Sequence, residues 1–314
     1  MKCLLCNNDT SFIIANKLRN GNKKNVYYCK KCDLGMLDYK RSDKDLKIFY
    51  NRNYRKEFKP RLNKAPDLKE LFDIYSNFQA NRIKLIKKFL TKKMKLLEIG
   101  CSVGMFLFHV KKYVKEITGI DYDSESAHFA SRKCLSPIFD VDIENTNLKE
   151  KTFDIICMFQ VLEHIKNPYE FLMKYRKYLK PNGIIYVEVP NLHDALIYAY
   201  GLPNHYNFYF HKAHLWYFTA KSLKILMKKV GFDGRIYCAQ DYNILNHMHW
   251  ISVDAPQDDC IFGLSLPRLP LRGQLGSHKK KELNNFIMRM DFEYKKILTK
   301  LGIASNLSFI GRKR

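Results

Sequence analysis

The sequence predicts a doubly wound α/β domain that follows a small N-terminal β module and precedes a C-terminal α+β extension. The main observation is that short apolar segments alternate with segments of helical pattern. The apolar segments are residues 96–99, 116–120, 137–141, 153–159 and 184–189. Buried strands that alternate with helices form a parallel sheet with helices on both faces. A glycine-containing turn at residues 100–104 follows the first predicted strand and supports this architecture.

The pattern divides the chain into four parts. These are the β module (1–40), a charged helical connector (41–92), the α/β domain (93–235) and the extension (236–314), which we expect to cap a substrate. In the connector, Pro66 and Asp67 form a helix start signal ahead of apolar residues at helical spacing. A later helix is expected from a cap at Thr219 to a stop at Gly231, and another over residues 280–301.

Composition limits the classes of protein that this chain can belong to. With 314 residues and a hydrophobic share of 46%, it can bury a sizeable core. The N-terminus lacks a charged segment followed by an apolar stretch, and no apolar run reaches the roughly 18–20 residues that cross a bilayer. We therefore expect a cytoplasmic protein without a transmembrane segment.

The formal net charge of +24 has two interpretations. A phosphate-bearing partner such as nucleic acid, a nucleotide-linked substrate or an anionic membrane face would explain it by function. A lysine-rich coding bias over solvated helix faces would explain it by composition. The lysines are scattered, with no tract longer than residues 279–281, which favours composition.

Four of the nine cysteines form two CxxC pairs near the N-terminus, and they are Cys3, Cys6, Cys29 and Cys32. Two such pairs flanking short β segments are typical of a zinc ribbon, in which four thiolates give Zn²⁺ a closed tetrahedral shell. A closed shell predicts a structural zinc, whose binding stabilises a module with little core of its own. The other five cysteines have no such spacing and are expected in the core.

The turn after the first strand has the features of a nucleotide-type cofactor site. Its glycines, Gly100 and Gly104, would let a ligand approach the backbone closely at the carboxyl end of the sheet. Asp121 closes the second strand, where its carboxylate could accept both hydroxyls of a ribose. Asp142 follows the third strand, where it could meet an adenine amine. The alternative is that both acids merely end their strands.

Residues 95–190 resemble a class I S-adenosylmethionine-dependent methyltransferase. The family's first motif, E-x-G-x-G-x-G, is matched by Glu98, Gly100, Ser102 and Gly104, with serine in place of the middle glycine. Its FDxx and VLEH segments are matched by residues 153–156 and 161–164, and its LKPGG turn by residues 179–183. The resemblance implies a Rossmann-like methyltransferase sheet that binds S-adenosylmethionine. It further implies that Phe159 and Gln160 lie against the cofactor, and that Asp142 and the backbone of Ile143 hold the adenine.

The acceptor side is less well defined. Many methyltransferases of this class that act on base amines carry N/D-P-P-Y/F after the fourth strand, and residues 159–162 do not match it. A zinc ribbon joined to a methyltransferase resembles sugar C-methyltransferases and related surface-glycan-cluster enzymes, which carry Y-H-E-H-x-x-Y-F-S. In the comparable residues 211–219, His214 falls on the family's base histidine and Ala213 replaces the preceding glutamate. The alternative is that His205, His211 and His214 only pack within an aromatic-rich lid.

The leading hypothesis is S-adenosylmethionine-dependent methyl transfer to a small molecule, namely a sugar, a nucleotide-linked sugar or another surface-glycan precursor. His214 would take the acceptor's proton with His211 beside it, since histidine suits proton removal near neutral pH. The alternative is a zinc-ribbon RNA methyltransferase whose basic surface holds phosphates, and a third hypothesis is a non-catalytic binding module. The acceptor atom (O, N or C) and the oligomeric state stay open.

Overall fold

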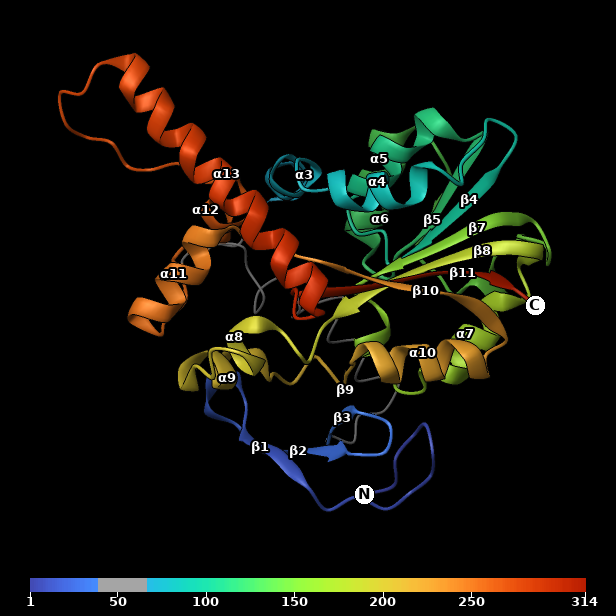
Figure 1. Cartoon of the computed structure of the whole chain (residues 1–314). Coiled ribbons are helices and arrows are strands. Elements are labelled where there is room, and N and C mark those ends of the chain that lie inside the picture. Colours follow the sequence, from blue (N-terminus) through green and yellow to red (C-terminus); the bar gives the residue numbers. More distant parts are fainter. Residues whose placement is uncertain (39–66) are drawn as a thin grey trace.

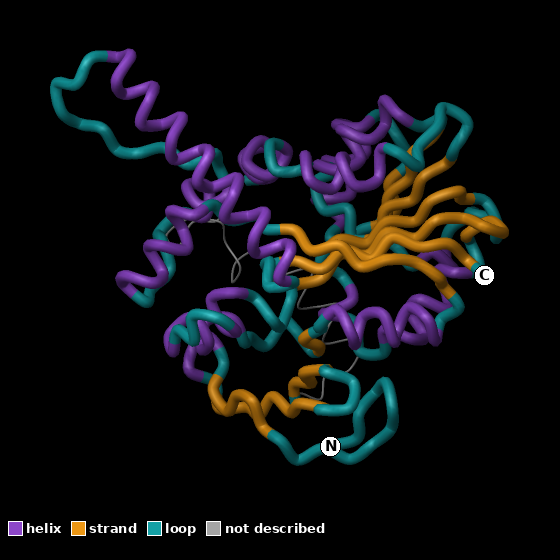
Figure 2. The backbone as a smooth tube through the Cα atoms, in the orientation of Figure 1, coloured by secondary structure: helices purple, strands orange, loops and turns teal. Residues whose placement is uncertain are grey.

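A computed structural model describes residues 1–38 and 67–314 of the chain (Figure 1). Pro66 of the predicted start signal and the first half of the predicted connector, residues 41–66, lie outside the described residues. Figure 2 shows the described strands gathered into a large sheet and a small one. In those two ranges, no helix combines the length and the apolar character needed to cross a membrane.

The large sheet has the order β10-β11-β8-β7-β4-β5-β6. Its strands are β4 (Lys95–Ile99), β5 (Glu116–Ile120), β6 (Ile138–Phe139), β7 (Phe153–Phe159), β8 (Leu179–Pro190), β10 (Phe232–Ala239) and β11 (Asn306–Lys313). The five strands from β4 to β8 are parallel, whereas β11 runs antiparallel to both β8 and β10. The predicted doubly wound α/β architecture is confirmed, with an antiparallel pair added at one edge.

Helices cover both faces of the large sheet, as Figure 1 shows. On one face lie α3 (Leu68–Ser76), α4 (Ala80–Lys87), α5 (Met105–Val110) and α6 (Ser124–Cys134). On the other lie α7 (Pro168–Arg176) and α10 (Ala220–Lys229). The remaining helices are α8 (Ala195–Tyr198), α9 (Pro203–Tyr209), α11 (Ile244–Val253), α12 (Cys260–Leu264) and α13 (Ser277–Leu301), with short 3₁₀ turns η1 (Arg19–Gly21), η2 (Lys111–Tyr113), η3 (Ile143–Asn145) and η4 (Leu162–His164).

Capping residues set several helix boundaries. Asp67 starts α3 by accepting a hydrogen bond from the Glu70 amide at 2.7 Å, as its sequence position predicts. The helical pattern of the connector then splits into α3 and α4. At the break, the buried side-chain amide of Gln79 donates to the carbonyl of Tyr75 at 2.9 Å, and the same carbonyl accepts from the Phe78 amide at 3.1 Å.

The small sheet has the order β1-β2-β3-β9. Its first three strands come from the N-terminal module: β1 (Ile13–Lys17), β2 (Lys23–Cys29) and β3 (Leu34–Leu37). The fourth, β9 (Trp216–Tyr217), comes from the far end of the α/β domain and pairs antiparallel with β3. The Leu37 amide extends the pairing with a 3.0 Å bond to the carbonyl of Leu215. The sheet of the N-terminal module is therefore completed by a strand from the α/β domain.

One continuous core joins the two sheets. Leu34 and Met36 of the module are fully buried, and they belong to the same apolar cluster as Leu97 and Val187 of the large sheet. The predicted module has little core of its own, and packing against the α/β domain supplies the rest.

The C-terminal extension contributes to the large sheet. The predicted boundary at residue 235 falls inside β10, and β11 inserts between β10 and β8. Both faces of β11 are buried along Leu307, Ser308 and Phe309, which accounts for its position inside the sheet. The extension and the α/β domain share this one sheet.

Candidate functional site

The turn after β4 lies at the switch point of the sheet, where β5 continues to one side and β7 to the other. Gly100 has a φ of 72°, and a Cβ there would lie 2.6 Å from Cγ2 of Val161. Ser102 also has a positive φ of 48°, which is uncommon for a residue with a side chain. Its amide donates to Oδ2 of Asp121 at 2.6 Å, and this bond holds the turn. The Asp121 side chain therefore lies against the glycine turn, where both could contact one ligand.

Glu98 lies one residue before the end of β4 and is 4% exposed. Burial raises the pKa of its carboxyl well above the usual range, although the guanidinium of Arg82 acts in the opposite direction. Among the described residues, Oε2 of Glu98 has no hydrogen-bond partner. A buried oxygen of this kind fits a donor supplied by a ligand, because an unpaired buried acceptor is destabilising.

Asp142 caps η3 at the adjacent strand end and brings Ile143 into the core. Its carboxylate accepts hydrogen bonds from Nζ of Lys174 at 2.6 Å and from the hydroxyl of Tyr122 at 3.0 Å. Burial acts to raise the pKa of Asp142, but the bonds with Lys174 and the Glu144 amide bring it below its usual value. The carboxylate is therefore ionised and held in place.

Phe159 is the last residue of β7, and Gln160 follows it. The Phe159 ring is buried and packs edge-on against Phe106 at 4.6 Å between ring centroids. Gln160 has a positive φ of 57°, and its side-chain amide donates to Glu188 at 3.3 Å and to Asn306 at 3.1 Å. Gln160 is thus fixed by β8 and β11 in a conformation that L-residues seldom adopt.

Arg82, which the sequence did not single out, joins this edge from α4. Its Nη2 forms a 2.6 Å ion pair with Glu188, and its guanidinium carbon lies 4.5 Å from the centre of the Phe159 ring. An arginine at a helical position carries no local mark of such a role. Only the approach of α4 to the end of β8 reveals it.

The two predicted catalytic histidines meet the segment that follows β7. Three bonds fasten the two segments together. The Leu215 amide donates to the Glu163 carbonyl at 2.7 Å, the Trp216 indole donates to the Ile165 carbonyl at 2.6 Å, and Nδ1 of His164 lies 2.9 Å from the Ala213 carbonyl. The predicted lid segment is thus attached to the end of the parallel sheet.

A buried carboxyl and three imidazoles gather where these segments meet, and we call Glu163, His164, His211 and His214 the histidine cluster. Oε1 of Glu163 lies 3.8 Å from Nε2 of His164 and 4.0 Å from Nε2 of His214. The rings of His211 and His214 are 3.8 Å apart between centroids. The structure therefore brings His211 and His214 together, whereas His205 packs against Trp250.

Burial dominates the electrostatics of the histidine cluster. It raises the pKa of Glu163 to about 8 and lowers that of His164 to about 4. Burial also lowers the pKa of His214 well below its usual range, and the neighbouring His211 and His164 lower it further. At neutral pH the imidazoles are uncharged and able to accept a proton. Glu163 belongs to the VLEH segment, but no local pattern in the sequence indicates that it faces His214.

The four ribbon cysteines converge as their spacing predicts. Their sulfurs all lie within 4.8 Å of one another, and Sγ of Cys6 is 3.6 Å from Sγ of Cys29. A tetrahedral zinc with Zn–S bonds of about 2.3 Å needs similar separations, so the four thiols fit that ion. Cys101, Cys134 and Cys157 are buried in the α/β domain, and Cys238 and Cys260 are half-buried.

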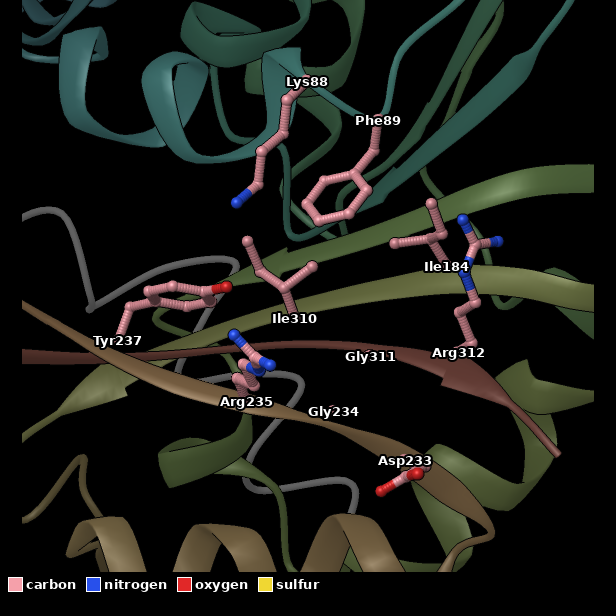
Figure 3. A pocket seen from close by; sticks show the side chains of 10 residues that line it. All are labelled: Lys88, Phe89, Ile184, Asp233, Gly234, Arg235, Tyr237, Ile310, Gly311 and Arg312. Carbon is pink, nitrogen blue, oxygen red and sulfur yellow. The ribbon is translucent and has the colours of Figure 1, made fainter.

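A separate hollow of about 490 Å³ lies on the β10–β11–β8 side of the sheet (Figure 3). Lys88 and Phe89 lie on one side of it, and Arg235 and Tyr237 of β10 on the other. It reaches Ile184, which pairs with the first half of β7. This hollow is therefore near the amino ends of the parallel strands, away from the glycine turn.

Comparison with known proteins identifies the family. A family model described as a methyltransferase domain matches residues 73–235, just over half of the chain. The chain belongs to this methyltransferase-domain family. The match contains the glycine turn, the strand-end acids and the histidine cluster, and it leaves out the ribbon and β11.

Individual relatives of this methyltransferase domain are distant. The ubiquinone biosynthesis O-methyltransferase of Pasteurella multocida (strain Pm70) is 26% identical over 112 residues, which cover 31% of this chain and 46% of that protein. The enzyme of the same name from Colwellia psychrerythraea is 25% identical over 104 residues, covering 31% and 42%. The chain thus spans less than half the length of these curated relatives. A SAM-dependent methyltransferase structure from Archaeoglobus fulgidus is 20% identical, with a TM-score of 0.49, and covers 77% of this chain and 99% of that one.

Proposed function

We propose that this chain transfers the methyl group of S-adenosylmethionine to a sugar, a nucleotide-linked sugar or another small surface-glycan precursor. The observation that carries methyl transfer is the glycine turn at the switch point of the sheet, with Asp121 bonded to Ser102 and the orphaned Oε2 of Glu98 beside it. Family membership supports the same activity.

In this proposal the cofactor lies across the carboxyl ends of β4, β5 and β6. Asp121 would accept the ribose hydroxyls, and Glu98 would receive the donor that its buried oxygen lacks. Asp142 and the Ile143 backbone would hold the adenine at the end of β6, and Phe159 and Gln160 would close the other side. The cofactor supplies an electrophilic methyl group on a sulfonium, and the protein's part is to align an acceptor with it.

The acceptor side is formed by the histidine cluster. The side chain of His214 is 14% exposed, and Glu163 is 1% exposed, so a reacting atom there would be largely shielded from water. Such enclosure favours a small acceptor over an RNA duplex. His214 would take the acceptor's proton, with His211 packed against it, and the zinc of the ribbon would stay structural.

Calorimetry with S-adenosylmethionine tests the cofactor site. The Asp121→Ala variant should lose about 1.5–3 kcal/mol of binding free energy, the range for hydrogen bonds to a charged group. Asp154→Ala is the matched control, because Asp154 is a carboxylate of the same sheet that pairs with Lys180 at the amino ends of β7 and β8, away from the glycine turn. Equal affinity in Asp121→Ala and wild type would refute this placement of the cofactor.

A methyl-transfer assay tests the acceptor class. Labelled S-adenosylmethionine is offered with a panel of nucleotide-linked sugars, with free sugars and with total RNA. Label in a sugar, absent from the Asp121→Ala variant, is the expected result. Label found in RNA alone would overturn the small-molecule acceptor.

A further inference from the structure

We infer that Glu163 is the carboxyl partner of His214, a positioning residue that stabilises the imidazolium formed when His214 takes a proton from the acceptor. This rests on the proposed function. The sequence offers no carboxylate next to His214, because Ala213 precedes it. The fold supplies one from η4, with Oε1 of Glu163 4.0 Å from Nε2 of His214.

The surroundings of Glu163 indicate a role beyond packing. The residue is 1% exposed, and within residues 1–38 and 67–314 neither of its carboxyl oxygens has a hydrogen-bond partner. A buried carboxyl without such a partner is destabilising unless something compensates for it. The Leu215 amide donates to the backbone carbonyl of Glu163. This bond holds Glu163 beside the His214 imidazole whether its carboxyl is neutral or ionised.

A second contact determines the tautomer of His164, the other imidazole beside Glu163. Nδ1 of His164 meets the carbonyl of Ala213 at 2.9 Å, which requires the proton on Nδ1 and leaves the lone pair of Nε2 toward Glu163. A carbonyl can only accept, so this tautomer follows from the contact. Two imidazoles thus border one carboxyl, and a proton that enters the group can be shared among them.

The reaction step balances without a further reagent. The acceptor atom X of an X–H group attacks the methyl carbon, the S–CH₃ bond breaks, and its electron pair stays on sulfur as S-adenosylhomocysteine. The proton of X–H passes to His214, and the ionised Glu163 carboxylate neutralises the imidazolium. The arrangement therefore suits an acceptor that must lose its proton, such as a hydroxyl, and is superfluous for a neutral amine.

The charges around the pair determine the pH dependence. Burial raises the pKa of Glu163 to about 8. The backbone N–H of Glu163 itself lowers this pKa, the charge of Glu188 raises it, and the guanidinium of Arg82 lowers it. The groups that act on His214 are all basic and disfavour its protonation: His211, His164 and Arg19. Below pH 8 the carboxyl is neutral and gives the imidazolium no counter-charge. Turnover should therefore rise as the pH increases through about 8.

The test compares Glu163→Gln, which keeps the shape and loses the charge, with Glu163→Asp, which keeps an ionisable carboxyl. With wild type, kcat should rise through about pH 8. Glu163→Gln should lower kcat roughly 10- to 100-fold above pH 8 and abolish this rise, with the affinity for S-adenosylmethionine unchanged. Glu163→Asp should recover part of the rise. A wild-type pH profile and kcat in Glu163→Gln would overturn the inference.

An NMR titration of the His214 ring gives a readout that does not depend on turnover. Its chemical shift should show a step near pH 8 in wild type, reporting the ionisation of Glu163, and no such step in Glu163→Gln. If that step is present and no acceptor is methylated, the proposed function fails while the partnership stands. If the step is absent from wild type, the partnership fails. The ligand atoms of Glu163, His164 and His214 lie within 4.8 Å of one another, close enough for these residues to share a metal ion. A metal ion in addition to the ribbon zinc that Glu163→Gln loses would therefore also overturn the inference.

Discussion

The ring of His214 lies between two other imidazoles, with centroids 3.8 Å away in His211 and 4.7 Å away in His164. We predict that His214→Ala lowers kcat by roughly 10²–10⁴, the usual contribution of a positioned general base, and leaves the affinity for S-adenosylmethionine unchanged. Steady-state kinetics and calorimetry measure the two effects. His211→Ala is the matched control and should do less, because the imidazole that takes the proton in this proposal is His214, whose Nε2 lies 4.0 Å from Glu163. Wild-type turnover in His214→Ala would show that the ring only packs.

Asp194 provides a second residue-level prediction, on stability. Its buried side chain caps α8 through the Leu196 amide at 2.8 Å, and burial raises the pKa of its carboxyl to about 7. A folded-state pKa above the unfolded value near 3.8 means that the native state binds the extra proton, so stability falls as the pH rises from about 4 through 7. Asp194→Asn keeps an N-cap acceptor and removes this titration.

The measurement is urea unfolding of wild type and Asp194→Asn at several pH values. The variant should be similar to wild type near pH 4 and more stable at pH 8, by an amount on the order of a few kcal/mol. Stability curves that stay parallel across this range would contradict the assignment.

At the scale of elements, Thr219 links α10 to the ribbon. Its hydroxyl donates to the Asp33 carbonyl at 2.9 Å and accepts from the Ser222 amide at 3.3 Å, while the Ser222 hydroxyl accepts from the Thr219 amide. Thr219→Ala should lower the free energy of unfolding by about 1–2 kcal/mol, the upper part of the range for N-cap losses, because a tertiary bond is lost with the cap. Thr219→Ser retains both bonds and should stay close to wild type. Chemical denaturation gives both values.

The elements also show what local sequence can and cannot predict. The strands β4, β5 and β7 are short segments rich in apolar residues between turn residues, so their positions could be predicted, as could the Thr219 cap. In contrast, β9 has two residues and exists only because β3 lies beside it. Likewise, β11 is separated from its partner β10 by three helices, and no local pattern announces that pairing.

The candidate site follows the same division. The spacing of the cysteines predicts the ribbon cluster, and the positions of Asp121 and Asp142 after predicted strands predict that they lie at the carboxyl end of the sheet. Both predictions rest on patterns within short stretches of sequence. The pairing of Glu163 with His214 and the ion pair of Arg82 with Glu188 join distant segments. Their partners could be identified only after the sheet order and the helix packing were known.

At the scale of the whole molecule, we predict one zinc per chain, bound by the four ribbon sulfurs. Elemental analysis of protein purified without chelator should find it, and Cys29→Ser should lose it, because three thiolates and a neutral hydroxyl form a poor zinc site. Loss of the metal should also lower the unfolding temperature of the entire chain, since Cys29 belongs to the core shared with the α/β domain. Cys260→Ser, outside the ribbon, is the control and should keep the ion. Zinc-free wild-type protein would contradict the assignment.

The pairing of β3 with β9 has a consequence for synthesis on the ribosome. Gly35 of β3 pairs with Tyr217 of β9, which the ribosome adds about 180 residues later, so β3 cannot pair with β9 until then. At about 5–20 residues per second, the delay is roughly 10–40 seconds. During that time the outer edge of β3, whose four residues are all buried in the finished protein, stays open to other chains. Nascent chains of this protein should therefore depend on chaperones until residue 217 has emerged, and the segment that carries His214 docks late, once the rest of the ribbon is in place.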